Sequence, residues 1–312
     1  MKKTTLLLTI LSVLVFNACK NVGFEKTKTG LEYKIIKGDK GEALDPGDIV
    51  KFQYKVTFKD SLVITTYNTM PAYDQVDSLG RHHDFSEFLA QMKVGDSAVC
   101  YQLFDTLQKK PEFGLPPYMK KGDKQEITIK VLAVFKAKNG ANPRDLAVED
   151  YRKEIELFKT KEMAAIEKYL SNKKINAVKV NNNVFVQIET EGTGARADSG
   201  KLVGVKYSGY NFEGKYFDSN TDTTRQLQKH PLETFFFTSK QEGAITGMLE
   251  GITLFKVGSK GKMFIPSLMA YGPQGMPPAI KPNENLIFDI EVVEVKDKPA
   301  APQQPEMPQP NR

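Results

Sequence analysis

Apolar and polar residues alternate along two stretches of the chain. The segments read ITIKVLAV at residues 127–134 and FDIEVVEV at residues 288–295. Because successive side chains of a strand point to opposite faces of a sheet, this period of two predicts strands with one buried face. Each segment is therefore expected to be a half-buried strand.

These two strands belong to a longer internal repeat. Residues 31–56 align without a gap on residues 184–209, and residues 92–101 match residues 255–264. The alternating strands then follow in the same order in both halves. A single shared motif could be chance, but a series of matches in one order indicates a duplication. The chain is predicted to contain two copies of one mostly β domain.

Each copy also contains one short stretch with helical spacing. In the second copy it spans residues 244–255, where apolar residues recur at the interval of a helix, and its counterpart in the first copy is 84–92. Many strands around a single helix are typical of an α+β fold. We expect each copy to be a twisted antiparallel sheet wrapped around a short α-helix.

A longer helix is predicted between the two copies, in a linker at residues 139–175. Asn142 is a suitable N-cap, and Pro143 suits the first helical position, where its missing N–H costs little. If the helix is continuous to Leu170, it is on the order of 40 Å long. Its amphipathic stripe consists of Tyr151, Ile155, Phe158, Met163, Ile166 and Leu170. The stripe either covers a domain of the same chain, which we favour, or pairs two chains.

The N-terminus has the features of an export signal. Lys2 and Lys3 precede an apolar run at residues 6–16, which is too short to span a bilayer but suits the core of a secretory signal. Cys19 follows a small residue directly after this run, and the arrangement resembles the lipobox of bacterial lipoproteins. The resemblance implies lipid attachment at Cys19 and membrane anchoring in the cell envelope. The expected location is the outer membrane, on the side that faces the periplasm. The alternative is ordinary cleavage that leaves Cys19 as an incidental thiol.

Composition excludes several other classes of function. Hydrophobic residues make up 40% and charged residues 26%, as in a soluble globular protein, and the net charge of +6 is spread over short basic blocks, which argues against nucleic-acid binding. Apart from Cys19 the chain has only Cys100, so no intrachain disulfide is expected. The three histidines lack a metal-ligand spacing, and neither a metal nor a cofactor is expected.

Four motifs in the second copy resemble a known family. They are Tyr-x-Gly and Gly-x-x-Phe-Asp-Ser within residues 205–220, Ala-Tyr-Gly at residues 270–272, and Phe-Asp-x-Glu at the start of the last strand. In combination they resemble the FK506-binding-protein (FKBP) type of peptidyl-prolyl cis–trans isomerase over residues 184–295. The resemblance implies isomerisation of X-Pro bonds in proline-containing exported proteins, with macrolide inhibitors as further ligands.

The family's pocket transfers onto this chain residue by residue. The resemblance implies that Tyr271 offers its hydroxyl to a substrate carbonyl, and that Asp218 lies near the twisting amide and the hydroxyl of Tyr207. Ile245 is implied to offer its backbone N–H to a second carbonyl. The full predicted substrate-binding set is Tyr207, Phe217, Asp218, Phe235, Ala244, Ile245, Met248, Tyr271, Ile280 and Phe288. Met248 replaces the tryptophan usual in the family, and the loop at residues 220–234 is longer than usual.

The first copy lacks most of this set. Ile64, Thr65 and Thr66 align with the Phe-Asp-Ser motif, Ile127 replaces Phe288, and Phe113 aligns with Tyr271. We therefore expect the first copy to have the same fold with little or no isomerase activity.

The expected organisation and function follow from these patterns. The predicted segments are a signal peptide (1–18), a tether (19–30), a degenerate FKBP-like domain (31–138), a helical linker (139–175), an isomerase domain (176–297) and a disordered Pro-rich tail (298–312). The leading hypothesis is an envelope isomerase. The alternatives are a non-enzymatic chaperone or proline-recognition module, and an anchor that displays the tail. The sequence predicts no oligomeric state.

Overall fold

The structure is a computed structural model of the chain of 312 residues. The residues it describes are 23–59, 61–77, 83–107, 120–138, 140–181 and 183–298. The predicted signal peptide, Cys19, Phe113 and all but the first residue of the predicted tail lie outside them. No helix in these ranges combines the length and apolarity of a membrane span.

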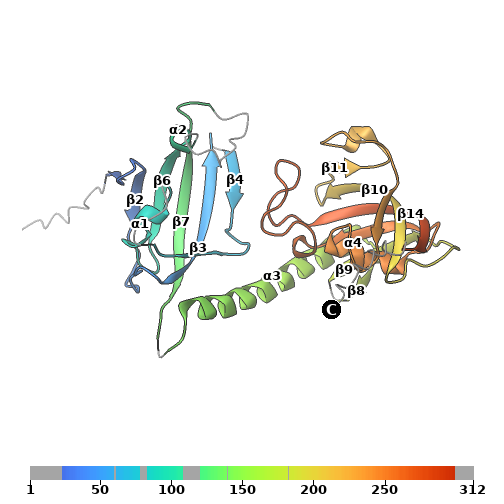
Figure 1. Cartoon of the computed structure of the whole chain (residues 1–312), viewed down its shortest axis with the longest axis horizontal. Helices are drawn as coiled ribbons and strands as arrows, with labels where there is room; N and C mark the ends of the chain where they lie inside the picture. The colour runs from blue at the N-terminus through green and yellow to red at the C-terminus, as the bar shows by residue number, and fades with distance from the viewer. Residues whose placement is uncertain are drawn as a thin grey trace, which may run out of the picture.

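The first half of the described chain forms a seven-stranded antiparallel sheet (Figure 1). Its order is β1-β2-β6-β7-β3-β4, with β5 paired to β3. A short helix, α1, packs its apolar residues into the core of this sheet. The elements are β1 (Glu25–Lys26), β2 (Glu32–Ile36), β3 (Ile49–Phe58), β4 (Ser61–Thr65), β5 (Ala72–Gln75), α1 (Ser86–Leu89), β6 (Ser97–Leu103), α2 (Phe104–Leu107) and β7 (Lys124–Phe135).

The second half forms another seven-stranded antiparallel sheet with its own core. Its order is β11-β10-β14-β13-β9-β8, with β12 paired to β10. The elements are β8 (Val178–Val180), β9 (Val184–Thr190), β10 (Lys201–Asn211), β11 (Tyr216–Ser219), η1 (Thr223–Arg225), β12 (Phe235–Thr238), α4 (Thr246–Gly251), η2 (Ile252–Leu254), β13 (Lys260–Ile265), η3 (Ser267–Met269) and β14 (Leu286–Asp297). The predicted α+β class is confirmed.

The strand registers confirm the internal repeat residue by residue. β3 pairs with β7 through a bulge between Lys51 and Phe52, and β10 pairs with β14 through a bulge between Gly204 and Val205. These two bulges fall on equivalent positions of the ungapped alignment. Because a bulge bends a strand at one fixed residue, a shared bulge indicates a shared fold and not only a shared composition.

The predicted linker helix is present as α3, Pro143–Lys173 (Figure 1). Asn142 has an extended backbone, and its side chain accepts the N–H of Arg144, as expected of an N-cap. The helix ends at Lys174, whose left-handed backbone (φ 54°) stops the helical ladder. At 31 residues the helix is long enough to reach both sheets.

The two ends of α3 contact different domains. Near its C-terminus Met163, Ile166 and Leu170 pack with Phe264 and other residues of the second sheet. Near its N-terminus the helix contacts the first sheet through Lys51, described below. The stripe is thus covered within the chain, as favoured from the sequence.

The stripe and the short helices differ from expectation in detail. Tyr151 is 39% exposed, because it stands edge-on to Tyr73 at the surface of the first domain. The helical stretch predicted at 84–92 shrinks to the four residues of α1. In the second domain α4 begins only at Thr246, because Ile245 has an extended backbone and is the N-cap.

A half-buried ion cluster joins α3 to the first sheet. The Lys51 ammonium lies 2.7 Å from a carboxylate oxygen of Asp150 and 2.7 Å from one of Glu154, and its side chain is only 11% exposed. The hydroxyl of Tyr73 also donates to Asp150. One cation therefore pairs with two carboxylates of the helix, and its own side chain is largely shielded from water.

Replacing Lys51 tests this connection. Lys51→Ala leaves two carboxylates partly buried without their cation, and it should lower the free energy of unfolding by about 1–3 kcal/mol. Lys153→Ala is the matched control, since Lys153 pairs with Glu149 at the surface, with both side chains more than half exposed. The control should change stability by less than about 0.5 kcal/mol in the same urea titration. Equal effects of the two substitutions would contradict a structural role for Lys51.

Candidate functional site

A cavity of about 480 Å³ opens in the second domain between the sheet and α4. Its lining residues come from β10, β11, β12, the N-terminus of α4, the segment after η3, and β14. They are Tyr207, Phe217, Asp218, Phe235, Gly243, Ala244, Ile245, Met248, Tyr271 and Phe288. The structure thus brings together nine of the ten predicted substrate-binding residues and adds Gly243. Ile280, the tenth, is 1% exposed and packs in the core beside the cavity.

Aromatic rings form the walls of this cavity. Tyr207 meets Phe235 edge-on with ring centroids 5.7 Å apart, and Phe217 meets Phe288 in the same way at 5.7 Å. Gly209 makes this packing possible: a Cβ at that position would lie 2.6 Å from the Phe217 ring and 2.8 Å from the Phe288 ring. Such contacts are far too close, so the walls require glycine at this position of β10.

The floor and one edge of the cavity come from the start of α4. Met248 is 3% exposed and fills the floor, where it keeps the surface apolar. As the N-cap of α4, Ile245 has φ −62° and ψ 148°, and its own N–H lies outside the helical ladder. That N–H is therefore located where a ligand carbonyl can accept it.

Asp218 is held by three donors. The Tyr207 hydroxyl donates to one carboxylate oxygen at 2.6 Å, while the backbone N–H of Ser219 donates to the other at 2.8 Å. The third donor is His230, whose Nε2 lies 2.7 Å from the same oxygen as Ser219. Burial, and then the hydrogen bond to Asp218, raise the pKa of Tyr207, so its hydroxyl keeps its proton at neutral pH.

The Tyr271 side chain, unlike that of Asp218, is not held by hydrogen bonds within the described residues. Burial, and then the charge of Asp218, raise the pKa of Tyr271. Within the described part of the chain its hydroxyl makes no hydrogen bond, although the residue lines the cavity. The phenol is thus a protonated donor with no partner in the described residues, and it faces the space a ligand would occupy.

The linker helix supports the segment that carries Tyr271. Glu162 of α3 is 4% exposed, and its carboxylate accepts the N–H of Ser267 at 2.8 Å and that of Leu268 at 3.3 Å. These two N–H groups begin η3, the turn directly before Tyr271. Burial raises the pKa of the Glu162 carboxyl. Sequence reasoning missed Glu162, whose only signal was a charged residue next to the apolar stripe of the linker.

The long loop at residues 220–234 is anchored at both ends. The Asn220 side chain accepts the N–H of Tyr207 and donates to the carbonyl of Glu233, which closes the base of the loop. The buried side chain of Gln226 donates to the carbonyl of Ser219 at 2.7 Å. The loop was expected from the sequence to be longer than usual, but its delivery of His230 to Asp218 was not foreseen.

In the first domain the corresponding positions differ chemically. Register sets Ile64 opposite Val56, as Asp218 stands opposite Gly209, so Ile64 is the counterpart of Asp218. This corrects the sequence alignment, which matched Thr65 to Asp218: Ile64 lies 8 residues after Val56, whereas Asp218 lies 9 residues after Gly209, so the first hairpin is one residue shorter. Ile127 does stand where β14 has Phe288. The first domain therefore has no carboxylate at this position.

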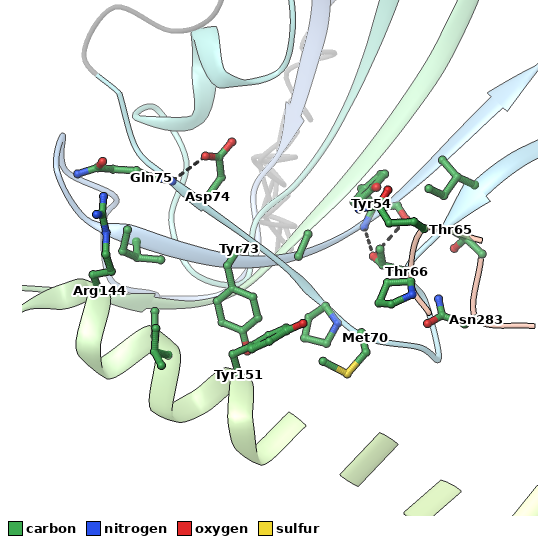
Figure 2. A pocket seen from close by; sticks show the side chains of 18 residues that line it. Tyr54, Thr65, Thr66, Met70, Tyr73, Asp74, Gln75, Arg144, Tyr151 and Asn283 are labelled. Atoms are coloured by element: carbon green, nitrogen blue, oxygen red, sulfur yellow. Dashed lines mark hydrogen bonds between the residues drawn. The ribbon is translucent and has the colours of Figure 1, made fainter. Parts of the chain in front are cut away.

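A second cavity, of about 630 Å³, lies where the first domain, α3 and a loop of the second domain meet (Figure 2). Tyr73 and Tyr151 meet edge-on at one side of it, and Asn283 reaches it from the second domain, close to Thr65. The side-chain oxygen of Asn283 is buried and has no hydrogen-bond partner among the residues that the structure describes. The groove itself is lined mostly by apolar surface.

The chemistry available in the first cavity is that of binding. It offers apolar walls, a phenol donor without a partner among the described residues, one N–H at a helix start, and a carboxylate that already accepts three hydrogen bonds. No group of three or more His, Cys, Asp or Glu residues suited to a metal ion occurs in the residues that were described.

The second domain matches a family of isomerases. Residues 194–293 match the family model described as FKBP-type peptidyl-prolyl cis-trans isomerase, which confirms the resemblance expected from the motifs. This part of the chain is similar to FKBP-type domains. Its cavity is built from the residues onto which the family's pocket was transferred.

Curated relatives extend the same comparison. "FK506-binding protein 4" of Dictyostelium discoideum is 42% identical over 102 residues, which cover 33% of this chain and 25% of the relative. "FKBP-type peptidyl-prolyl cis-trans isomerase FkpA" of Aeromonas hydrophila is 38% identical over 137 residues, covering 43% of this chain and 47% of the relative. The chain thus matches less than half the length of each. Among solved structures, FkpA from Escherichia coli is 28% identical with a TM-score of 0.37, covering 50% of this chain and 69% of that one.

Glu162→Ala tests whether the linker helix supports the Tyr271 segment. Loss of the carboxylate leaves the N–H of Leu268 without its acceptor and weakens the start of η3, so amide exchange at residues 267–272 should accelerate severalfold. Glu167→Ala is the control, because Glu167 lies on the same helix but pairs with Lys179 at the surface. Unchanged exchange in Glu162→Ala, measured by hydrogen–deuterium exchange, would show that the segment stands without the helix.

Proposed function

We propose that the chain is a peptidyl-prolyl cis–trans isomerase whose active site is the cavity of the second domain. The supporting observation is the meeting of a free Tyr271 hydroxyl, the start of α4 and aromatic walls around one apolar space. The domain that carries them matches the FKBP-type family. Tyr271, Asp218 and Tyr207 are the proposed catalytic residues.

The mechanism follows from the physics of the peptide bond. Rotation about C–N has a barrier of about 18–20 kcal/mol, because resonance gives the bond partial double-bond character. The planar amide is more charge-separated than the twisted one, so an apolar cavity disfavours the planar form relative to water. An enzyme accelerates the rotation by binding the twisted amide better than the planar one. No covalent bond is broken, and the reaction requires no nucleophile.

Each polar group has a role in that preference. In the proposed complex the Tyr271 hydroxyl and the Ile245 N–H donate to two substrate carbonyls and fix the chain on either side of the rotating bond. The proline ring lies between Phe217, Phe288 and the floor at Met248. Asp218, fixed by its three donors, lies at the edge of the amide, where its field acts on the changing dipole.

The cellular location, clients and inhibitors proposed for this activity are inferred from the sequence. Residues 1–18 are the proposed signal, and a lipid on Cys19 anchors the protein in the cell envelope. The clients are proline-containing exported proteins, for which X-Pro isomerisation takes tens to hundreds of seconds uncatalysed and limits folding. Macrolides that bind the family are the proposed inhibitors of the same cavity. We retain residues 31–138 and 176–297 as the two domains.

One observation favours a second, non-enzymatic role for the first domain. The groove of about 630 Å³ combines the tyrosine pair with the exposed side of α3 (Figure 2). The side chains of an extended client segment can cover such an apolar wall. The first domain is then an inactive client-binding module beside the active one.

A double substitution tests the isomerase. In the full chain, Asp218→Val with Tyr271→Phe should lower kcat/KM for short X-Pro peptides by about tenfold or more in a protease-free assay, because both polar groups at the rotating amide are lost. The first domain has no carboxylate at the matching position, so little activity should remain. Residual activity equal to the unsubstituted chain would place the active site elsewhere.

Client binding is tested separately from catalysis. The same double variant should still suppress the aggregation of an unfolded model protein, since its groove is intact. Tyr151→Ser with Val148→Ser should weaken suppression, because both residues line the groove and are exposed. Leu157→Ser is the control, an exposed apolar residue of α3 that lies outside the groove. If the control and the groove variant lose suppression equally, the groove is not the client site.

A further inference from the structure

His230 belongs to the loop at residues 220–234, which packs against the proposed active site. Gln226 packs beside its ring and is itself buried, with its side chain tied to Ser219 next to Asp218. The backbone N–H of Leu227 donates to the carbonyl of Phe217 at 3.1 Å. Backbone and side-chain contacts therefore hold the loop, and His230 reaches Asp218 from a defined position.

The geometry of the imidazole favours its doubly protonated form. Nε2 lies 2.7 Å from a carboxylate oxygen of Asp218, and Nδ1 lies 3.0 Å from the carbonyl oxygen of Pro231. Both partners are acceptors that carry no proton. A neutral imidazole has only one N–H, so only the doubly protonated cation donates to both acceptors. The amide nitrogen of Gln226, a donor, lies farther away, at 3.5 Å from Nδ1 and 3.4 Å from Nε2. When His230 loses a proton, one of the two bonds must break.

From this geometry we propose that His230 is a pH-dependent positioning residue of the isomerase, which pairs as a cation with Asp218 and makes turnover depend on its own protonation. The inference rests on the proposed function. His230 acts through Asp218 and does not itself touch the rotating amide. The set of pocket residues predicted from the family resemblance did not include this histidine.

The charges around the pair determine the direction of the effect. Asp218, Tyr207 and Tyr271 face it from the sheet and the Tyr271 segment, and only Asp218 carries a charge at neutral pH. Within the loop Arg225 pairs with Asp222, the Lys229 ammonium bonds the carbonyl of Thr223, and the Glu233 carbonyl is held by Asn220.

The hydrogen bond to Asp218, and then that to Pro231, raise the pKa of His230 above its ordinary 6.5. The ion pair between His230 and Asp218 is therefore fully formed below pH 6.5, and it is lost as the pH rises through the raised pKa of His230. The relevant window lies above pH 6.5.

Loss of the pair should reduce turnover. An unpaired carboxylate beside an apolar cavity attracts water, and water stabilises the planar amide that the site must disfavour. A paired carboxylate is less hydrated and keeps its position against Tyr207. The expected fall in kcat/KM is about two- to fivefold, the size of effect typical of a partly exposed ion pair.

Three forms of the full chain test the proposal in a protease-free assay from pH 5.5 to 8.5. The unsubstituted chain should lose activity as the pH rises. His230→Lys keeps a cation throughout, so its profile should be flat at the high level. His230→Asn has no cation and should be flat at the low level. The unsubstituted profile should thus meet the lysine variant at low pH and the asparagine variant at high pH.

A second measurement separates this proposal from the isomerase itself. The titration of the His230 ring proton by NMR, identified by its absence in His230→Asn, should give a pKa above 6.5 that returns toward 6.5 in Asp218→Asn. A ring pKa that Asp218→Asn leaves unchanged, or a pH profile that His230→Asn shares with the unsubstituted chain, would overturn the proposal. An intact titration with no isomerase activity at any pH would overturn the proposed function and the effect on turnover, while leaving the ion pair established.

Discussion

The proposed site depends on a missing side chain at one position of β10. Gly209 stands opposite Phe288 in the sheet, and a Cβ there would collide with the rings of Phe217 and Phe288. Those rings form the apolar walls, and their packing fixes the width of the cavity that Tyr207 and Tyr271 enter. The first domain has Val56 at the equivalent position, with Ile127 opposite it. Val56 and Ile127 thus stand where the second domain has Gly209 and Phe288, so the aromatic wall has no counterpart at this pair of positions.

The linker helix makes the second domain depend on residues outside it. Met163, Ile166 and Leu170 cover Phe264 and Ile287, which lie on the face of the sheet away from the cavity. Glu162 then reaches past them to the turn before Tyr271. A carboxylate buried this far costs free energy unless its bonds are good, so its presence indicates that the η3 turn needs an external acceptor. At its other end the same helix binds the first sheet through Lys51. A displacement of the helix would therefore change its contacts with both domains.

Much of this arrangement could be predicted, and the limits have a physical cause. The duplication, the sheet strands and the linker helix follow from local periodicity and capping, which a chain expresses within a few residues. The cavity residues followed from motifs that resemble a known family. Glu162, by contrast, acts on Ser267 across 105 residues, and no local pattern encodes that contact. His230 is only 12 residues from Asp218, but its approach depends on how Asn220 and Gln226 fold the loop. The alignment of Thr65 with Asp218 failed because the hairpin between β3 and β4 is one residue shorter than the hairpin between β10 and β11.

The two polar side chains of the cavity differ in a way that limits the chemistry. Asp218 accepts bonds from Tyr207, Ser219 and His230, which occupy three of the about four lone-pair sites of a carboxylate. A general base must have a free lone pair within reach of the proton it removes. The Tyr271 hydroxyl has no partner among the described residues, but burial raises its pKa and keeps it a donor. A carboxylate that already accepts three bonds, beside a neutral donor, is less suited to proton abstraction than a free carboxylate. The site is well suited to a reaction that only rotates a bond, because holding a carbonyl while the amide turns requires a donor and no proton transfer.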